Sequence, residues 1–187
     1  MKILVVDNGG QWTHREWRVL RDLGVDTAIV PNTLGYDELD ADGLVLSGGA
    51  PRVGEDTPKL GNSGEYLDKA TIPILGICVG HQFMTLHFGG SAGPAEVAEF
   101  GKVELIVDDH DEILKSLPDR FQGWLSHNDE TKILPENFIG LAHSKNCRYQ
   151  AMRHETRPIF GVQFHPEVEH TEHGEDIFKN FIGVCKK

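Results

Sequence analysis

The chain has 187 residues, a formal net charge of −11, and 39% hydrophobic against 25% charged residues. This composition predicts a globular protein with a substantial core and excludes disordered and collagen-like chains. Its acidity argues against a nucleic-acid partner, and no apolar run reaches the roughly 18–20 residues needed to cross a membrane. Asp7 and Asn8 interrupt the apolar start, which argues against a signal peptide. We therefore expect one domain over residues 1–187, in the cytoplasm and without a nucleic-acid or membrane partner.

Short apolar runs alternate with helical patterns through the first half of the chain. The strands predicted in this half are Lys2–Val6, Asp26–Val30, Gly43–Leu46 and Pro73–Ile77. Helices are predicted over Trp12–Leu23, over a segment that ends at Glu65–Ala70, and over Phe83–Phe88. This alternation predicts a parallel sheet that is covered by helices on both faces.

The second half of the chain has a less regular pattern. Its short strand candidates, which no helical pattern separates, are Lys102–Val107, Phe121–Leu125, Phe138–Ala142 and Tyr149–Arg153. Pro158–Phe164 is the last apolar strand, and Gly174–Cys185 is predicted to be a closing amphipathic helix. The fold class expected is therefore α/β: an open, mostly parallel sheet flanked by helices, with a small antiparallel extension.

The strongest local motif is Gly76–Gly80, in which Cys78 stands between two glycines directly after a predicted buried strand. This G-x-C-x-G pattern resembles a nucleophile elbow, a tight turn that exposes the central side chain at the end of the strand. The helix that follows would stabilise a thiolate through the positive end of its dipole. The alternative is a small buried cysteine in a glycine-rich turn. Cys147 and Cys185 lack such surroundings, and three widely spaced cysteines fit a reducing compartment rather than a disulfide framework.

A partner for a nucleophilic thiolate is available far along the chain. His165 and Glu167 lie two residues apart just beyond the last apolar strand, so in an extended segment their side chains face the same way. Pro166 keeps His165 out of the helical region. The ends of parallel strands meet at one edge of the sheet, where open α/β sheets have their sites. A histidine at a strand end is often structural, but together with the elbow it indicates a catalytic pair oriented by a third group.

Acyl transfer also needs hydrogen-bond donors for the developing oxyanion. Ser47–Gly49 offers backbone N–H groups in a turn after a strand, and Val79 offers the N–H that follows the nucleophile. The alternatives are an ordinary glycine turn or the start of a pyrophosphate-binding SGGxDS loop. Ala50–Pro51 lacks the Asp-Ser continuation of that loop, and no G-x-x-x-x-G-K-[ST] motif occurs. We expect no ATP site in this chain.

Two further polar clusters are open to interpretation. Trp124–Glu130 concentrates polar groups between strand candidates, either as the lining of a pocket or as an exposed loop. The histidines and glutamates of His165–His173 resemble a metal site in composition, but their spacing matches no common helical zinc motif. We therefore predict no metal.

With these residues assembled, the chain resembles the class I glutamine amidotransferases, which use a catalytic triad. The resemblance runs nearly end to end, and Gly76–Gln82 together with Phe164–Glu167 carries it. Within this family, Val5–Gln11, Ser126–Asp129 and Phe164–Gly174 are most similar to the free-standing glutaminase subunits of archaeal-type GMP synthases. The fold implied is a flavodoxin-like sheet.

The resemblance implies roles for particular residues of this sequence. Cys78 would attack the side-chain amide of glutamine, His165 would move protons, and Glu167 would orient His165. The N–H groups of Gly49 and Val79 match the oxyanion hole of the family. The positions that hold the amino-acid end of glutamine correspond to Gln82, Ser126 and His127. Two differences from the family pattern affect the oxyanion hole and the glutamine-binding residues. Ala50 separates the oxyanion turn from Pro51, and Asn128 stands where many members of the family have glycine.

The resemblance also implies a partner, a separate ATP-pyrophosphatase subunit that binds ATP, Mg²⁺ and XMP and receives ammonia. No cofactor is expected on this chain itself. Glu169–Glu175 adjoins the predicted catalytic pair, and we expect this stretch to contact the partner, in particular through His170 and Thr171.

Two other functions stay open at the level of sequence. The same triad would serve a γ-glutamyl hydrolase, or an amidotransferase for another acceptor. A catalytically silent regulatory subunit is the second alternative, although the intact set of Cys78, His165 and Glu167 argues against it.

Overall fold

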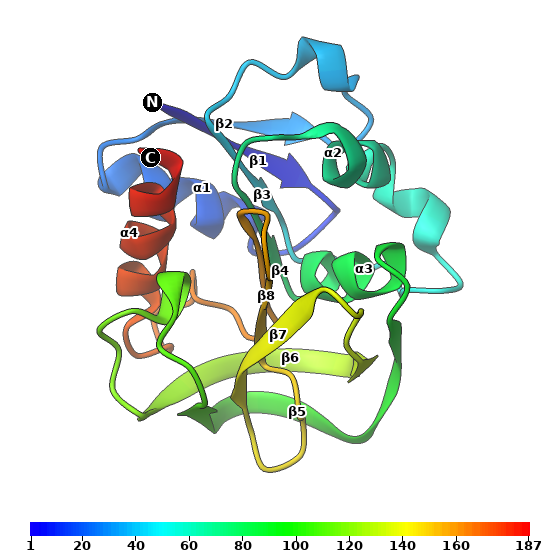
Figure 1. Ribbon diagram of the computed structural model, residues 1–187, viewed down its shortest axis with the longest axis vertical. Helices are drawn as coiled ribbons and strands as arrows, with labels where there is room; N and C mark the ends of the chain where they lie inside the picture. The colour runs from blue at the N-terminus through cyan, green and yellow to red at the C-terminus, as the bar shows by residue number, and fades with distance from the viewer.

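Nine strands form one continuous sheet in the computed structural model, which describes residues 1–187 (Figure 1). The sheet has the order β2-β1-β3-β4-β9-β8-β7-β5-β6. The strands are β1 (Lys2–Asp7), β2 (Asp26–Pro31), β3 (Gly43–Leu46), β4 (Ile74–Ile77), β5 (Ser91–Val107), β6 (Arg120–Ile133), β7 (Phe138–His143), β8 (Ala151–His154) and β9 (Ile159–Val162). The α-helices are α1 (Thr13–Asp22), α2 (Ser63–Lys69), α3 (Val79–His87) and α4 (Gly174–Cys185), and short 3₁₀ turns cover η1 (Tyr36–Glu38), η2 (Thr57–Leu60) and η3 (Glu112–Leu114).

The five strands β2-β1-β3-β4-β9 run parallel, as the apolar runs predict. Every residue of β3, β4 and β9 is buried, because helices cover both faces of this half of the sheet. Alternate residues of β1 point to opposite faces: Ile3 and Val5 pack in one hydrophobic cluster with residues of α1 and α4. Leu4 and Val6 pack in the other, with residues of α2 and α3. The two helix pairs flank the sheet in Figure 1.

The remaining strands, β8, β7, β5 and β6, extend the sheet in antiparallel pairs beyond β9. This confirms the predicted fold class, but the extension is larger than expected. β5 and β6 are much longer than the predicted Lys102–Val107 and Phe121–Leu125. Register shifts between Ser91 and Ala92, and between Pro94 and Glu99, interrupt the alternation of side chains that would have revealed the full length of β5.

In the parallel half of the sheet, four chain segments begin at the carboxyl ends of neighbouring strands. The chain leaves β1 toward β2 on one side while β3 lies on its other side, so a topological switch point lies between β1 and β3. In open α/β sheets, crevices form at such points beyond the carboxyl ends of the strands. The segments after β1, β3, β4 and β9 therefore meet there, and the last three of them carry the predicted catalytic and oxyanion residues.

Candidate functional site

Cys78 lies between β4 and α3 in a strained backbone conformation, with φ 51° and ψ −105°. The flanking glycines are required by packing. A Cβ atom on Gly80 would lie 2.5 Å from the carbonyl oxygen of Leu46, and one on Gly76 would lie 2.8 Å from the carbonyl carbon of Gly80. The turn therefore has the geometry of a nucleophile elbow, in which the close approach of helix and strand forces the cysteine side chain outward.

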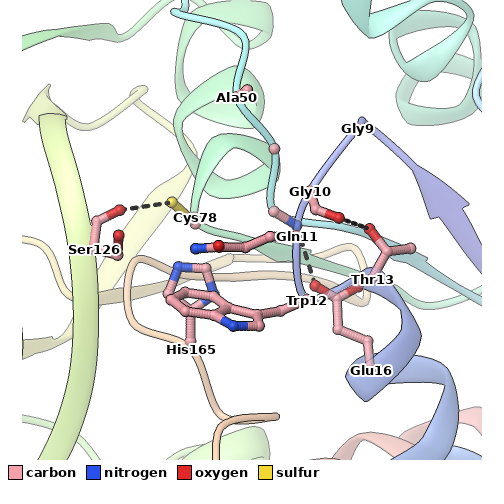
Figure 2. Close-up of a pocket in the computed structure, with 12 residues that line it drawn as sticks. Gly9, Gly10, Gln11, Trp12, Thr13, Glu16, Ala50, Cys78, Ser126 and His165 are labelled. Atoms are coloured by element: carbon pink, nitrogen blue, oxygen red, sulfur yellow. Dashed lines mark hydrogen bonds between the residues drawn. The ribbon is translucent and has the colours of Figure 1, made fainter.

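The structure brings His165 to a cavity that Cys78 also lines, with Glu167 hydrogen-bonded to its ring. Nδ1 of His165 lies 2.7 Å from Oε1 of Glu167, and both residues are buried. The backbone N–H of His165 donates to the carbonyl oxygen of Trp124 at 2.9 Å, which fixes the segment to β6. Cys78 and His165 line one cavity of about 340 Å³, and Figure 2 shows both side chains facing it.

The contacts of Gly48 show how close the side chains of Cys78 and His165 lie to the oxyanion turn. A Cβ atom on Gly48 would lie 3.1 Å from Cε1 of His165 and 3.7 Å from Cβ of Cys78. The oxyanion turn therefore lies directly against both residues. No larger residue would fit at this position without moving His165.

Electrostatics favour a charged imidazole at His165. Burial lowers the pKa of His165, but the negative charges of Glu167 and of a Cys78 thiolate raise it by more, so that it lies well above its usual value. The raised pKa favours the imidazolium form of His165, in which a second proton is available for transfer. This is the protonation state that a thiolate nucleophile needs in its partner.

Two backbone donors face the same region as the nucleophile. Gly49 and Val79 line a second cavity of about 300 Å³ that also reaches Cys78. The N–H of Gly49 has no acceptor within the protein. Val79 is the first residue of α3, so its N–H is one of the donors that a helix leaves unsatisfied. The turn that carries Gly49 is held by Asn8, whose N–H and side-chain amide bond to Oγ and O of Ser47 at 2.9 and 3.0 Å.

The predicted substrate-binding residues line this second cavity, but they differ in what their side chains do. The carbonyl oxygen of Ser126 lies 4.0 Å from Sγ of Cys78. Nε2 of Gln82 donates to the carbonyl oxygen of Asp129 at 2.6 Å and to Oε1 of Gln163 at 3.0 Å. The ring of His127 is buried and bonds to that same Asp129 carbonyl and to Glu99. Both ring nitrogens of His127 are therefore used within the protein, which leaves neither free to bind a ligand.

Ser126–Asp129 is a strand and not the loop that the sequence suggested. These residues belong to β6 and pair with β5 through Phe100↔Ser126 and Glu99↔His127. Loop residues and edge-strand residues are both rich in polar groups, and the pairing with β5 depends on residues far away in the sequence. The strand gives this wall of the cavity a fixed backbone.

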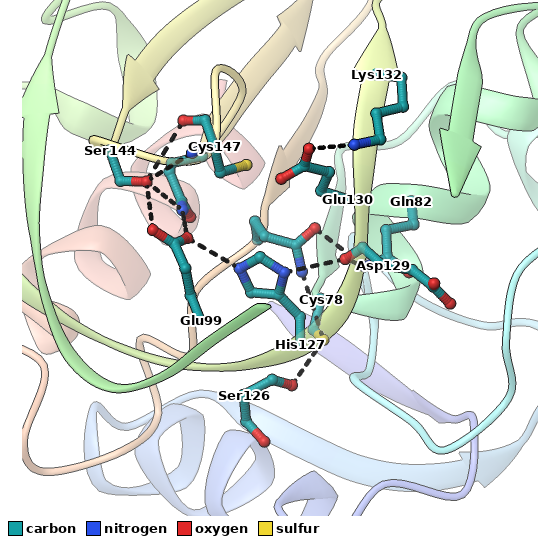
Figure 3. A network of polar contacts seen from close by, with 12 residues as sticks. Cys78, Gln82, Glu99, Ser126, His127, Asp129, Glu130, Lys132, Ser144 and Cys147 are labelled. Atoms are coloured by element: carbon teal, nitrogen blue, oxygen red, sulfur yellow. Dashed lines mark hydrogen bonds and ion pairs between the residues drawn. The ribbon is translucent and has the colours of Figure 1, made fainter. Parts of the chain in front are cut away.

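A buried polar network supports the β6 wall (Figure 3). Glu99 accepts hydrogen bonds from Ser144 and Gln150 at 2.7 Å each and pairs with His127 at 3.1 Å. Burial raises the pKa of Glu99, but these hydrogen bonds lower it by more, so the carboxylate stays charged. Nothing in the sequence pattern pointed to Glu99, because its partners come from two distant segments, β6 and the connection between β7 and β8.

Three residues of the site were missed by the sequence analysis. The ring of Trp12 meets the ring of His165 edge-on, with centroids 4.5 Å apart. Nε2 of Gln163 lies 3.6 Å from Sγ of Cys78. Oε1 of Glu16 accepts a hydrogen bond from the N–H of Gly48 at 3.2 Å, and Oε2 has no partner.

Of these three residues, Glu16 is the one that the sequence pattern could have identified. It precedes Leu20 by four residues, so it lies on the buried face of α1. Burial raises the pKa of Glu16, and the charge of Glu167 raises it further, to well above the usual value. A carboxyl group whose neutral form is favoured by the raised pKa therefore lies beside the oxyanion turn.

The structure separates the two residues predicted to contact a partner. His170 is exposed and packs on the Trp124 ring at 5.0 Å. Thr171 is buried: its hydroxyl donates to the carbonyl oxygen of His165 at 2.7 Å and accepts from the N–H of Trp124 at 2.9 Å. The polar atoms of Thr171 are therefore used within the chain, and its contact with a partner stays a prediction.

No three His, Cys, Asp or Glu side chains lie close enough together to hold a metal ion. No helix is long and apolar enough to span a membrane.

Comparison with known proteins identifies a family. A family model described as glutamine amidotransferase class-I matches residues 4–184. A relative from Thermoplasma acidophilum, named as one subunit of a glutamine-hydrolyzing GMP synthase, is 58% identical over 99% of this chain and 93% of its own length. A protein of the same name from Thermococcus kodakarensis is 48% identical over 98% of both chains.

Solved structures agree on the fold. A crystal structure from Thermoplasma acidophilum, described as that of a GMP synthase subunit, has a TM-score of 0.95 at 57% identity, covering 100% of this chain and 94% of that one. A glutamine amidotransferase of Thermotoga maritima has a TM-score of 0.76 at 21% identity, covering 100% of this chain and 82% of that one, and it supports the fold alone.

Replacing Glu16 by Gln is expected to stabilise the protein increasingly as pH rises. The raised pKa means that folded Glu16 keeps a proton that the unfolded chain releases, so its contribution to stability is lost as pH rises from the unfolded pKa through the folded one. Gln has the same shape and does not titrate.

Thermal unfolding between about pH 4 and pH 9 measures this effect, with each kcal/mol worth about 2–4 °C in a chain of this size. The difference in Tm between variant and wild type should grow with pH. Glu136→Gln, at an exposed position, should show no such trend. A difference for Glu16→Gln that is the same at every pH contradicts a neutral Glu16.

Proposed function

Because the chain belongs to the glutamine amidotransferase class-I family, we propose that it is the glutamine-hydrolysing subunit of a GMP synthase. The observation that carries the proposal is the meeting of Cys78, His165 and Glu167 beside two free backbone donors. The names of the relatives, which cover nearly the whole chain, supply the acceptor reaction.

Hydrolysis begins when the Cys78 thiolate attacks the side-chain amide carbon of glutamine. The N–H groups of Gly49 and Val79 bind the oxyanion of the tetrahedral intermediate. His165 gives its proton to the departing nitrogen, ammonia leaves, and a glutamyl thioester remains on Cys78. His165 then takes a proton from water, the hydroxide attacks the thioester, and glutamate is released with regeneration of the thiolate. Glu167 holds the imidazole through Nδ1 during both steps.

Glutamine binds in the cavity between the oxyanion turn and β6. Gln82 and the backbone at Ser126 are oriented toward it, and Gln163 supports both Gln82 and the sulfur. His127 is a positioning residue in this scheme, since Glu99 and the Asp129 carbonyl hold its ring.

The ammonia is consumed by a separate synthetase subunit that binds ATP, Mg²⁺ and XMP. The relatives are named as subunits, which supports this arrangement. His170 is an exposed residue of Glu169–Glu175, and we expect contact with the partner to reach the catalytic histidine through it. Thr171 and Trp124 connect this stretch to the backbone of His165 on both sides.

Replacing Cys78 by Ala is expected to abolish glutamate release from glutamine, by more than about 1,000-fold, because no other nucleophile reaches the amide. Glutamate and GMP are measured with and without an added synthetase subunit, ATP, Mg²⁺ and XMP. Wild-type glutamate release should rise with the partner and match GMP formation. Cys185→Ala, at a half-buried position outside both cavities, should behave as wild type. Glutamate release that persists in Cys78→Ala contradicts the mechanism.

Replacing Glu167 by Gln is expected to shift the alkaline limb of kcat/KM to lower pH by about 1–3 units. The charge of Glu167 raises the pKa of His165, so its removal lets the imidazolium lose its proton earlier. The pH profile of glutamine hydrolysis measures this. Glu169→Gln removes an exposed carboxylate two residues away and should leave the limb in place. An unshifted limb in Glu167→Gln rules out this role.

Replacing His170 by Glu is expected to weaken coupling without affecting basal glutamine hydrolysis. The concentration of the synthetase partner that gives half-maximal GMP formation should rise roughly 3- to 10-fold, as for a charge at the rim of an interface. His110→Glu alters an exposed histidine elsewhere and serves as the control. Equal half-maximal concentrations for both variants would remove His170 from the interface.

A further inference from the structure

Glu16 is buried beside the catalytic cavity, and the mechanism above assigns it no role. It lies on the inner face of α1, and its side chain reaches the turn that follows β3 (Figure 2). Oε1 of Glu16 accepts a hydrogen bond from the N–H of Gly48 at 3.2 Å. Gly48 itself lies against the catalytic histidine, since a Cβ atom there would be 3.1 Å from Cε1 of His165. Glu16 therefore holds a backbone group that is in direct contact with the site.

Ser47 holds the next peptide group of the same turn. Its hydroxyl donates to the carbonyl oxygen of Gly48 at 2.8 Å and accepts from the N–H of Asn8 at 2.9 Å. Ser47 is buried, and its own N–H donates to the carbonyl oxygen of Val6 at 3.1 Å. The hydroxyl group is therefore fixed by the chain around the end of β1, and it fixes the carbonyl group of Gly48 in turn.

These two contacts determine where the N–H of Gly49 points. The C=O of Gly48 and the N–H of Gly49 belong to one planar trans peptide group, so they point in opposite directions. Because Ser47 holds this carbonyl group, the N–H of Gly49 is directed away from Ser47 and has no acceptor within the protein. Glu16 fixes the preceding peptide group in the same way, through the N–H of Gly48.

We propose that Glu16 and Ser47 are positioning residues for the oxyanion hole: they fix the two peptide groups on either side of Gly48, so that the N–H of Gly49 is presented to the oxyanion. This inference rests on the proposed hydrolysis of glutamine and adds two side chains to the machinery of that reaction. Neither side chain contacts the substrate in this scheme, since both act through the backbone.

The turn depends on this support because its own backbone provides little. Among residues 48–51, the N–H of Gly48 is the only one that makes a hydrogen bond. Two successive glycines also leave the backbone free to adopt other conformations. If Glu16 were apolar, the N–H of Gly48 would be a buried donor without a partner, which is costly. Rotation of the peptide groups would relieve this cost, and it would turn the N–H of Gly49 away from the oxyanion.

A neutral carboxyl group suits the position of Glu16. Burial and the charge of Glu167 raise the pKa of Glu16, which favours the neutral form. In that form Oε1 still accepts from Gly48, while the proton is carried by Oε2, which has no partner. The turn is therefore held without a second negative charge beside the developing oxyanion. A glutamine side chain would supply an equivalent acceptor.

The test compares a reaction of Cys78 that forms an oxyanion with one that does not. Glutamine hydrolysis passes through a tetrahedral oxyanion. Alkylation by iodoacetamide forms a bond from the thiolate sulfur to a CH₂ carbon and expels iodide, so it forms no oxyanion. Both reactions are measured with the full chain in the presence of its synthetase partner, and labelling of Cys78 is followed by mass spectrometry. Cys147 and Cys185 should stay unlabelled, because burial raises the pKa of each to about 12.

Ser47→Ala and Glu16→Leu should each lower kcat for glutamine about 10- to 100-fold and change KM by less than about 3-fold, because binding of the ground state does not need the oxyanion donor. Alkylation of Cys78 should keep its wild-type rate. Glu16→Gln keeps an oxygen that accepts from Gly48 and should restore most of kcat. Glu136→Leu alters an exposed glutamate elsewhere and should change neither reaction. Ser47→Ala removes a single oxygen atom, so the test remains available if Glu16→Leu does not fold.

Parallel losses of hydrolysis and alkylation would mean that both residues only support the fold around Cys78, and would overturn the inference. An unchanged kcat in Ser47→Ala and Glu16→Leu, or a Glu16→Gln variant as impaired as Glu16→Leu, would overturn it as well. In each of these cases the wild type still hydrolyses glutamine, so the proposed function survives. Failure of the wild-type complex to hydrolyse glutamine overturns the proposed function and, with it, this inference.

Discussion

Cys78 adopts a φ of 51° between a buried strand and a buried helix, and this conformation determines much of what surrounds it. The turn is possible only because Gly80 allows α3 to approach the backbone of β3 closely and Gly76 allows it to approach that of β4. The same approach leaves the first N–H of α3 unpaired beside the sulfur. Strain of about 1–3 kcal/mol is typical of such a residue, and the packing of β3, β4 and α3 around it must offset this cost.

The antiparallel half of the sheet has a clear structural role at the site. The catalytic histidine follows β9, the strand at which the parallel and antiparallel halves meet. Its backbone is held by Trp124 of β6, both directly and through Thr171. β6 in turn is anchored by the buried contact between Glu99 and His127. Ser144 and Gln150 donate hydrogen bonds to the Glu99 carboxylate. Removing one side chain of this buried network would leave the polar groups of the others without a hydrogen-bond or charge partner. The network therefore gives β6 a defined position.

The sequence could predict the parts of the site that depend on local chain geometry. A cysteine flanked by glycines directly after an apolar strand predicts the tight turn that exposes its side chain. His165 and Glu167 lie two residues apart on a segment stiffened by Pro166, so their spacing predicts that they act together. The rest depends on contacts between distant segments. Glu16 and Gly48 lie 32 residues apart, and Thr171 contacts Trp124 across 47. The bulged pairing of β5 with β6 hides the length of both strands, which is why Ser126–Asp129 was mistaken for a loop.

Glu16 and Glu167 are two buried carboxyl groups of one site that have different hydrogen-bond partners. Glu167 has the imidazolium of His165 at 2.7 Å as a partner for its charge. Glu16 has one backbone N–H and an oxygen with no partner, too little to compensate a buried charge. Burial and the charge of Glu167 raise the pKa of Glu16 well above its usual value, which favours its neutral form. A second carboxylate here would oppose formation of the Cys78 thiolate, so the raised pKa of Glu16 favours the chemistry at Cys78.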